Sequence, residues 1–114
     1  MHELGIAESA LTVALGRARD EGAARVLRMV IRVGALSGVD PEALRFAFTA
    51  ILPGTPAEGA VLQIDPIAAI AHCPDCKRDF TPDTDHFLEC PACGRLSSMV
   101  KQGRELDLVS LEVI

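Results

Sequence analysis

The sequence predicts a small α/β protein with two helices on a three-stranded sheet and a four-cysteine domain inserted before the last strand. Three observations lead to this fold class. Apolar residues recur at helical spacing in two segments and alternate in three others. All four cysteines lie within 21 residues, between the second and third alternating segments. With 114 residues, the chain has the length of one domain carrying a small insert.

Two segments are predicted to be helices. In residues 3–21 the apolar side chains follow three- and four-residue spacing, and Gly22 is a stop signal. This stripe consists of Leu4, Ala7, Leu11, Ala14, Leu15 and Ala18. The second helix begins after Asp40, a good N-cap, with Pro41 at its first position, and the prolines at 53 and 56 end it. Its apolar face consists of Leu44, Ala47, Phe48 and Ile51.

Residues 24–33, 60–69 and 104–113 are predicted to be strands. The first carries Leu27, Met29, Ile31 and Val33 in alternation. In the third, the alternation changes phase between Leu108 and Val109. Either a β-bulge or burial of both faces would explain that change. We expect one domain from residues 1–70, completed by residues 104–114, and a second from residues 71–103.

The cysteines form two pairs, Cys73-Pro-Asp-Cys76 and Cys90-Pro-Ala-Cys93, separated by 13 residues. Two such turns can place four thiolates around one Zn²⁺, so we expect a zinc-ribbon-like insert. A closed four-thiolate site has no open position, which indicates a structural ion. Two disulfides and a rubredoxin-like iron site are the alternatives, and spacing alone does not exclude iron.

Composition restricts the function. The net charge is −5, Trp and Tyr are absent, and residues 71–103 hold four basic and five acidic side chains. We therefore expect no nucleic-acid binding. Neither an export signal nor an apolar run of membrane-spanning length is apparent, so we expect a cytoplasmic protein without membrane contact. No Ser-His-Asp set or phosphate-binding loop points to an enzyme.

The N-terminal Met1-His2-Glu3 is a candidate second metal site. The α-amine, the deprotonated amide of His2 and its imidazole can chelate one ion, and the amide of Glu3 or a carboxylate can complete the plane. Planar nitrogen ligands suit Ni²⁺ and Cu²⁺. The alternative is a solvated histidine at a frayed terminus.

These motifs together resemble the HypA/HybF family of nickel metallochaperones, which mature nickel–iron hydrogenases and, in some bacteria, urease. The resemblance covers the full chain. It includes the Met-His-Glu start, Leu4-Gly5-Ile6-Ala7, the segment Val33-Gly34-Ala35-Leu36-Ser37-Gly38-Val39-Asp40-Pro41, and both Cys-Pro-x-Cys turns.

The resemblance implies a transported Ni²⁺ at His2, with backbone nitrogens of Met1 and Glu3 as candidate co-ligands. It implies a structural Zn²⁺ at Cys73, Cys76, Cys90 and Cys93. It also implies two kinds of partner, a HypB-like GTPase and a hydrogenase large-subunit precursor that accepts the nickel, with urease accessory proteins as further candidates.

Three other side chains bear on these sites. Asp40 is interpreted as an N-cap, and its carboxylate also becomes a nickel ligand candidate if the second helix begins near the N-terminus. Some family members have a histidine just after each cysteine pair, whereas here His72 and His86 precede the pairs. We expect both to be solvated or to lie outside the first coordination shell.

Two other functions are consistent with four cysteines. One is a zinc-ribbon accessory protein of transcription or translation, which would need a basic or aromatic binding face. The other is a rubredoxin-like electron carrier, which visible absorption would reveal. The leading hypothesis remains a nickel-delivery protein.

Overall fold

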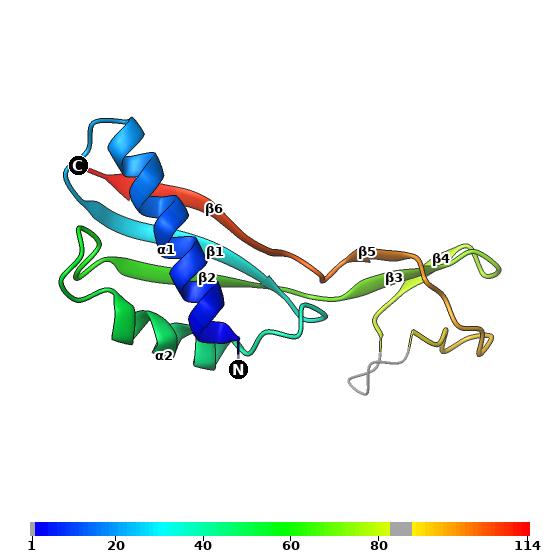
Figure 1. Ribbon diagram of the computed structural model, residues 1–114. Helices are drawn as coiled ribbons and strands as arrows, with labels where there is room; N and C mark the ends of the chain where they lie inside the picture. Colours follow the sequence, from blue (N-terminus) through cyan, green and yellow to red (C-terminus); the bar gives the residue numbers. More distant parts are fainter. Residues whose placement is uncertain (1, 83–87) are drawn as a thin grey trace.

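The computed structural model describes residues 2–82 and 88–114, and these form an elongated molecule of 54 × 26 × 17 Å (Figure 1). Two three-stranded sheets follow one another along the long axis, and both helices lie on the sheet that contains the C-terminal strand. Neither described helix has the length and hydrophobicity that a bilayer crossing requires.

The first sheet has the strand order β2-β1-β6. Its central strand, β1 (Val26–Gly34), pairs in parallel with β2 (Val61–Ile67) and antiparallel with β6 (Leu106–Val113). A parallel pair requires a crossover connection, and α2 (Pro41–Ile51) provides it between β1 and β2. The three predicted strands and their shared sheet are therefore confirmed.

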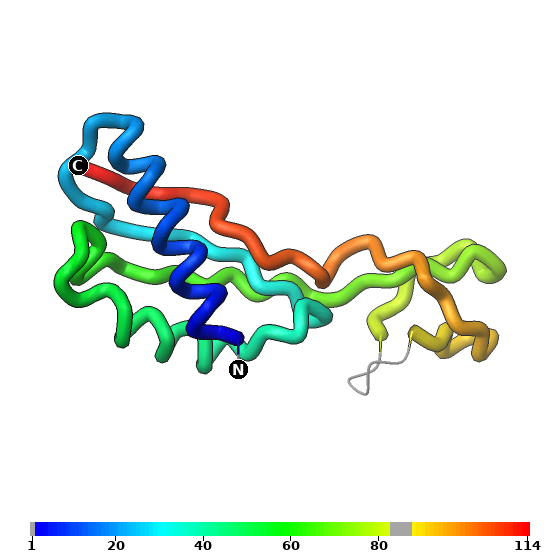
Figure 2. The backbone as a smooth tube through the Cα atoms, in the orientation of Figure 1, coloured from blue at the N-terminus to red at the C-terminus, as the bar shows by residue number. Residues whose placement is uncertain are grey.

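Both helices pack against this sheet (Figure 2). The first, α1 (Glu3–Asp20), contacts β1, β6 and α2, while α2 contacts β2. The largest fully buried side chains of the core are Phe48, Met29, Leu44 and Val26. The predicted stripe of α1 is buried at its alanines and Leu11, but Leu4 is half exposed and Ile6 packs against the core in that turn instead.

Two β-bulges set which side chains of the sheet face the core. The β1–β6 register shifts between Val26 and Arg28, so Val26 is buried and Leu27, predicted to lie inside, is exposed. A second shift leaves Val109 without a partner on β1, and Leu108 and Leu111 then both pack against the core. Of the two explanations for the phase change in the last strand, the bulge is correct.

The cysteine-bearing segment forms a second sheet with the order β4-β3-β5, which sequence patterning did not predict. Its strands are β3 (Ile70–Cys73), β4 (Arg78–Phe80) and β5 (Val100–Gln102), and both pairs are antiparallel. Strands of three or four residues are too short to show a clear alternation, so they escape periodicity analysis.

The two sheets meet at a close backbone crossing. A Cβ atom on Gly34, at the end of β1, would lie 2.1 Å from the carbonyl oxygen of Gly103. Gly103 itself has φ +118°, and a Cβ there would lie 2.7 Å from the Cα of Ala69. Hydrogen bonds from the N–H of Leu36 to the carbonyl of Gly103 and from the N–H of Gly34 to that of Glu105 close the crossing. Glycine at both positions lets three chain segments pass within contact distance.

Candidate metal sites

The two cysteine pairs are carried by separate pieces of chain. Cys73 ends β3, and the turn that follows it brings Cys76 back toward it; Cys90 and Cys93 lie in a loop closed by the Glu89–Leu96 bridge. Each turn needs a left-handed residue directly after its second cysteine. Gly94 has φ 76° there, and Lys77 adopts φ 55° in the first turn, a conformation that costs a non-glycine residue energy.

All four sulfur atoms lie within 4.8 Å of one another. The Sγ atoms of Cys73 and Cys93 are 3.6 Å apart, and those of Cys76 and Cys90 are 3.9 Å apart. Tetrahedral zinc with Zn–S bonds of about 2.3 Å places its sulfurs about 3.8 Å apart. A disulfide would instead need about 2.05 Å, and all four cysteines are free. The cluster thus fits one tetrahedral metal ion and no disulfide.

The surroundings of the cysteines give their thiols different pKa values. Backbone N–H groups of Cys93 and Ala92 lower the pKa of Cys90 to about 7. The neighbouring thiol of Cys93, followed by desolvation, raises the pKa of Cys76. One cysteine is thus ready to bind as a thiolate near neutral pH, while another holds its proton until a cation replaces it.

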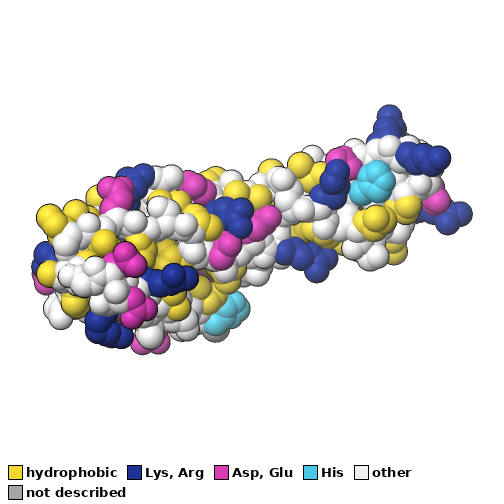
Figure 3. Space-filling view, turned by 90° about the horizontal axis from the view of Figure 1, so that it is seen from above, with side chains coloured by type: hydrophobic (Ala, Val, Ile, Leu, Met, Phe, Trp, Pro, Cys, Tyr) yellow, Lys and Arg dark blue, Asp and Glu magenta, His cyan; other side chains and the backbone are white. Residues whose placement is uncertain are grey.

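Around the cluster, contacts between polar side chains join the strands at the surface. His72 Nδ1 lies 2.8 Å from one carboxylate oxygen of Asp79, and Lys101 Nζ lies 2.8 Å from the other. Lys101 first and then His72 lower the pKa of Asp79. His72 therefore pairs with a carboxylate beside the cysteine cluster, and Figure 3 shows lysine and arginine side chains around this end of the molecule. His86 lies outside the described residues.

At the start of α1, the structure brings His2, Glu3 and Asp40 into one region. Met1 lies outside the described residues. His2 is exposed and is the N-cap residue of α1, and its side chain makes no capping hydrogen bond. The carboxylate of Glu3 accepts a hydrogen bond of 3.3 Å from the backbone N–H of Asp40. The second helix thus begins beside the first turn of α1, as Figure 1 also shows.

Asp40 acts as the predicted N-cap. Its Oδ1 accepts a hydrogen bond of 3.0 Å from the N–H of Glu42, and Pro41 occupies the first turn. Asp40 is a nickel ligand candidate if the second helix begins near the N-terminus. Its hydrogen bond to Glu3 shows that the helix does begin there.

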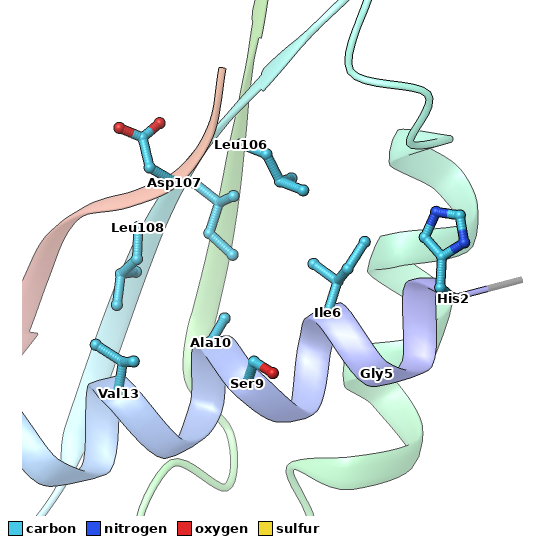
Figure 4. Close-up of a pocket in the computed structure, with 10 residues that line it drawn as sticks. His2, Gly5, Ile6, Ser9, Ala10, Val13, Leu106, Asp107 and Leu108 are labelled. Atoms are coloured by element: carbon cyan, nitrogen blue, oxygen red, sulfur yellow. The ribbon is translucent and has the colours of Figure 1, made fainter. Parts of the chain in front are cut away.

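His2 also borders an apolar groove of about 650 Å³ between α1 and β6 (Figure 4). Ile6, Val13 and Leu108 are among the side chains that line it, and in the close-up the ring of His2 stands at its end, beside α2. An ion held at His2 would therefore lie at the surface, next to a partly open apolar surface.

The architecture and the cysteine cluster place this chain among small mixed α/β proteins in which four cysteines are arranged for metal binding. Residues 1–113 match the family described as "Hydrogenase/urease nickel incorporation, metallochaperone, hypA". This chain belongs to that HypA family, which confirms the resemblance inferred from the sequence motifs.

Individual relatives agree along the whole length. A "Hydrogenase maturation factor HypA" of Picosynechococcus is 44% identical over 114 residues, covering 100% of both chains. One from Chloroflexus aurantiacus is 41% identical and covers 98% of each chain. The solution structure of the Ni metallochaperone HypA from Helicobacter pylori superposes with a TM-score of 0.70 at 26% identity, covering 100% of this chain and 98% of that one.

Sequence reasoning found the four cysteines but missed the polar contacts around them. Asp79 and Lys101 each belong to a three-residue strand that hydrophobic periodicity did not predict. A signal was present in hindsight, because Asp79 lies directly opposite His72 in the β3–β4 register. Detecting it requires knowing that these strands pair.

Proposed function

We propose that this protein is a nickel metallochaperone and not an enzyme. It binds Ni²⁺ at its N-terminus and delivers it, in the cytoplasm, to the precursor of the large subunit of a nickel–iron hydrogenase. The observation that carries the proposal is the match of residues 1–113 to a nickel-incorporation family in a chain that presents His2 at its exposed end.

The nickel site of the proposal consists of the His2 imidazole and backbone nitrogens of Met1 and Glu3. The exposed His2 supports it, since an ion that must be transferred needs a site that an incoming ligand can reach. The contact of Glu3 with the start of α2 supports carboxylates of Glu3 and Asp40 as alternative ligands. Planar nitrogen ligation favours Ni²⁺ over Zn²⁺, which prefers a tetrahedral arrangement.

The structural ion of the proposal is Zn²⁺ on Cys73, Cys76, Cys90 and Cys93. Sulfur separations close to those of tetrahedral zinc support this assignment. We further propose two functional units, residues 1–70 with 104–114 for nickel and residues 71–103 for zinc. Their proposed partners are a HypB-like GTPase and the hydrogenase precursor, with urease accessory proteins as further candidates.

Nickel binding is tested by changing the N-terminus alone. Insertion of one glycine before Met1 moves the amine out of chelating range, and His2→Ala removes the ring. Each change is expected to abolish specific Ni²⁺ binding in calorimetric titrations, while the zinc content stays at one per chain. One glycine added after Ile114 is the matched control and should leave Ni²⁺ affinity unchanged.

The spectrum of the nickel-loaded native protein separates the ligand sets. Planar coordination through a deprotonated amide gives a diamagnetic ion that forms more completely as the pH rises. A six-coordinate paramagnetic ion would transfer the assignment to the carboxylates of Glu3 and Asp40. If the glycine-extended protein bound one Ni²⁺ with unchanged affinity, the N-terminal site would be refuted.

Zinc binding is tested by removing single sulfurs. Cys73→Ser and Cys90→Ala are each expected to lose the zinc and the ordered structure of residues 71–82 and 88–103, because so small a sheet buries little apolar surface of its own. Metal analysis and amide NMR spectra measure both effects. One zinc per chain retained after loss of a single cysteine would contradict the four-cysteine site.

A further inference from the structure

Ser97 is the one buried polar residue within residues 2–82 and 88–114, with 6% of its surface exposed. Its side-chain oxygen has two backbone partners. It donates a short hydrogen bond to the carbonyl oxygen of His72 and accepts one of 3.1 Å from the N–H of Met99. Its own backbone N–H donates to the carbonyl of Leu88 at 2.8 Å. The hydroxyl and the backbone N–H of Ser97 therefore both bond to backbone groups of other residues.

The partners of Ser97 lie next to metal-ligand candidates in both cysteine pairs. His72 directly precedes Cys73 on β3, and its N–H also donates to the carbonyl of Met99 at 2.8 Å. Leu88 lies two residues before Cys90, whose N–H bonds to the carbonyl of Arg95 to close the second turn. Ser97 therefore sits where the piece of chain that carries the first pair meets the piece that carries the second.

A second contact between the two pairs lies at the surface and has a different character. Arg95 Nε lies 3.0 Å from a carboxylate oxygen of Asp75, and their side chains are 75% and 52% exposed. Exposed ion pairs of this kind contribute little to stability because solvent screens them. A buried hydroxyl with two backbone partners is different, since its removal leaves the partners without a replacement from solvent.

We propose that Ser97 is a positioning residue for the four-cysteine site: its buried hydroxyl fixes the first cysteine pair against the second before metal binds. The inference rests on the proposed zinc site and assigns Ser97 no bond to the ion. Residues outside the ligand set that orient ligands commonly change metal affinity 10- to 100-fold when mutated. Ser97→Ala removes one donor and one acceptor and is expected to weaken zinc binding about tenfold or more.

The experiment measures zinc affinity of the full chain by competition with a chromophoric chelator, for the native protein and three variants. Ser97→Ala tests the buried hydroxyl. Ser98→Ala, which removes the exposed hydroxyl next to it, and Arg95→Gln, which breaks the exposed ion pair, are the controls and should each change the affinity less than about threefold. Co²⁺ replaces zinc as a spectroscopic probe of the ligand set.

A positioning role predicts a specific pattern. Ser97→Ala should keep the Co²⁺ spectrum of tetrahedral four-thiolate coordination, because no ligand is lost, while its affinity falls and chelators remove zinc faster. The circular dichroism signal of α1 and α2, which pack on the first sheet, should stay unchanged. Native zinc affinity in Ser97→Ala would overturn the inference while leaving the four-cysteine site standing.

Two other results are also decisive. Loss of helical signal in Ser97→Ala would show a general folding role and refute a role confined to the metal site. If the native protein itself bound no zinc, the proposed zinc site would fail, and the inference about Ser97 would fail with it for a reason that the variant did not cause.

Discussion

At the scale of single residues, the cysteine cluster shows how local backbone sets chemistry. Cys90 and Cys76 both lie in Cys-Pro-x-Cys turns, yet the pKa of Cys90 is lowered to about 7 and that of Cys76 is raised. The difference arises because backbone N–H groups point at Cys90, whereas Cys76 faces other thiols. The first cysteine of one turn thereby becomes a prepared thiolate, and the second cysteine of the other turn holds its proton.

The first prediction concerns protons released on zinc binding. The pKa of Cys90 is depressed, so its thiolate is present above about pH 7 and is protonated as the pH falls through that value. Zinc must then displace one more proton, so affinity should fall more steeply with pH below this point. Calorimetric titrations in buffers of different ionisation enthalpy count the protons. An equal count at about pH 6 and about pH 8 would contradict the shifted pKa of Cys90.

At the scale of elements, the start of α2 combines a structural role with proximity to the N-terminus. Asp40 caps the helix through its side chain, while its backbone N–H binds the carboxylate of Glu3. One residue thus links the first turn of α1 to the first turn of α2.

The second prediction separates capping from metal binding at Asp40. Asp40→Ala removes the acceptor of the Glu42 N–H and is expected to lower the free energy of unfolding by about 1 kcal/mol. Asp40→Asn keeps a capping oxygen and should stay close to the native value. Urea denaturation measures both variants. A Ni²⁺ affinity that drops in the asparagine variant, with stability retained, would show that the carboxylate is a nickel ligand.

At the scale of the whole molecule, the crossing of Gly34, Gly103 and Ala69 joins the two sheets. Backbone atoms are in contact at this crossing, and main-chain hydrogen bonds close it. It is therefore a packed junction and not a free linker. Strands β1 and β5 end at this crossing, and β6 begins next to it. The orientation of the cysteine-bearing sheet therefore depends on this point.

The third prediction tests that junction. Gly34→Ala places a Cβ atom 2.1 Å from the carbonyl oxygen of Gly103, and backbone on both sides must move. We expect a loss of about 2–3 kcal/mol in the free energy of unfolding, at the upper end of overpacking effects. Gly16→Ala is the matched control: the nearest atom to its Cβ is 3.8 Å away, and alanine favours the helix, so that variant should gain up to about 1 kcal/mol. Equal stability of the two variants would refute a tight junction.

Features that depend on near neighbours in the chain could be predicted from the amino-acid sequence. The caps of α2, the apolar face of that helix, and the positions of β1, β2 and β6 follow from patterns within a dozen residues. The cysteine pairs were equally visible, since a metal site built from two tight turns has a fixed spacing. Family membership followed because these local motifs occur together in one short chain.

Features that depend on contacts between distant segments became visible in the three-dimensional structure alone. The bulges at Leu27 and Val109 arise from pairing between β1 and β6, so alternation alone placed Leu27 on the wrong face. The burial of Ser97 depends on its meeting β3, 25 residues earlier in the chain. The contact between Glu3 and Asp40 spans 37 residues. No local pattern encodes such meetings, because they are set by how whole elements pack.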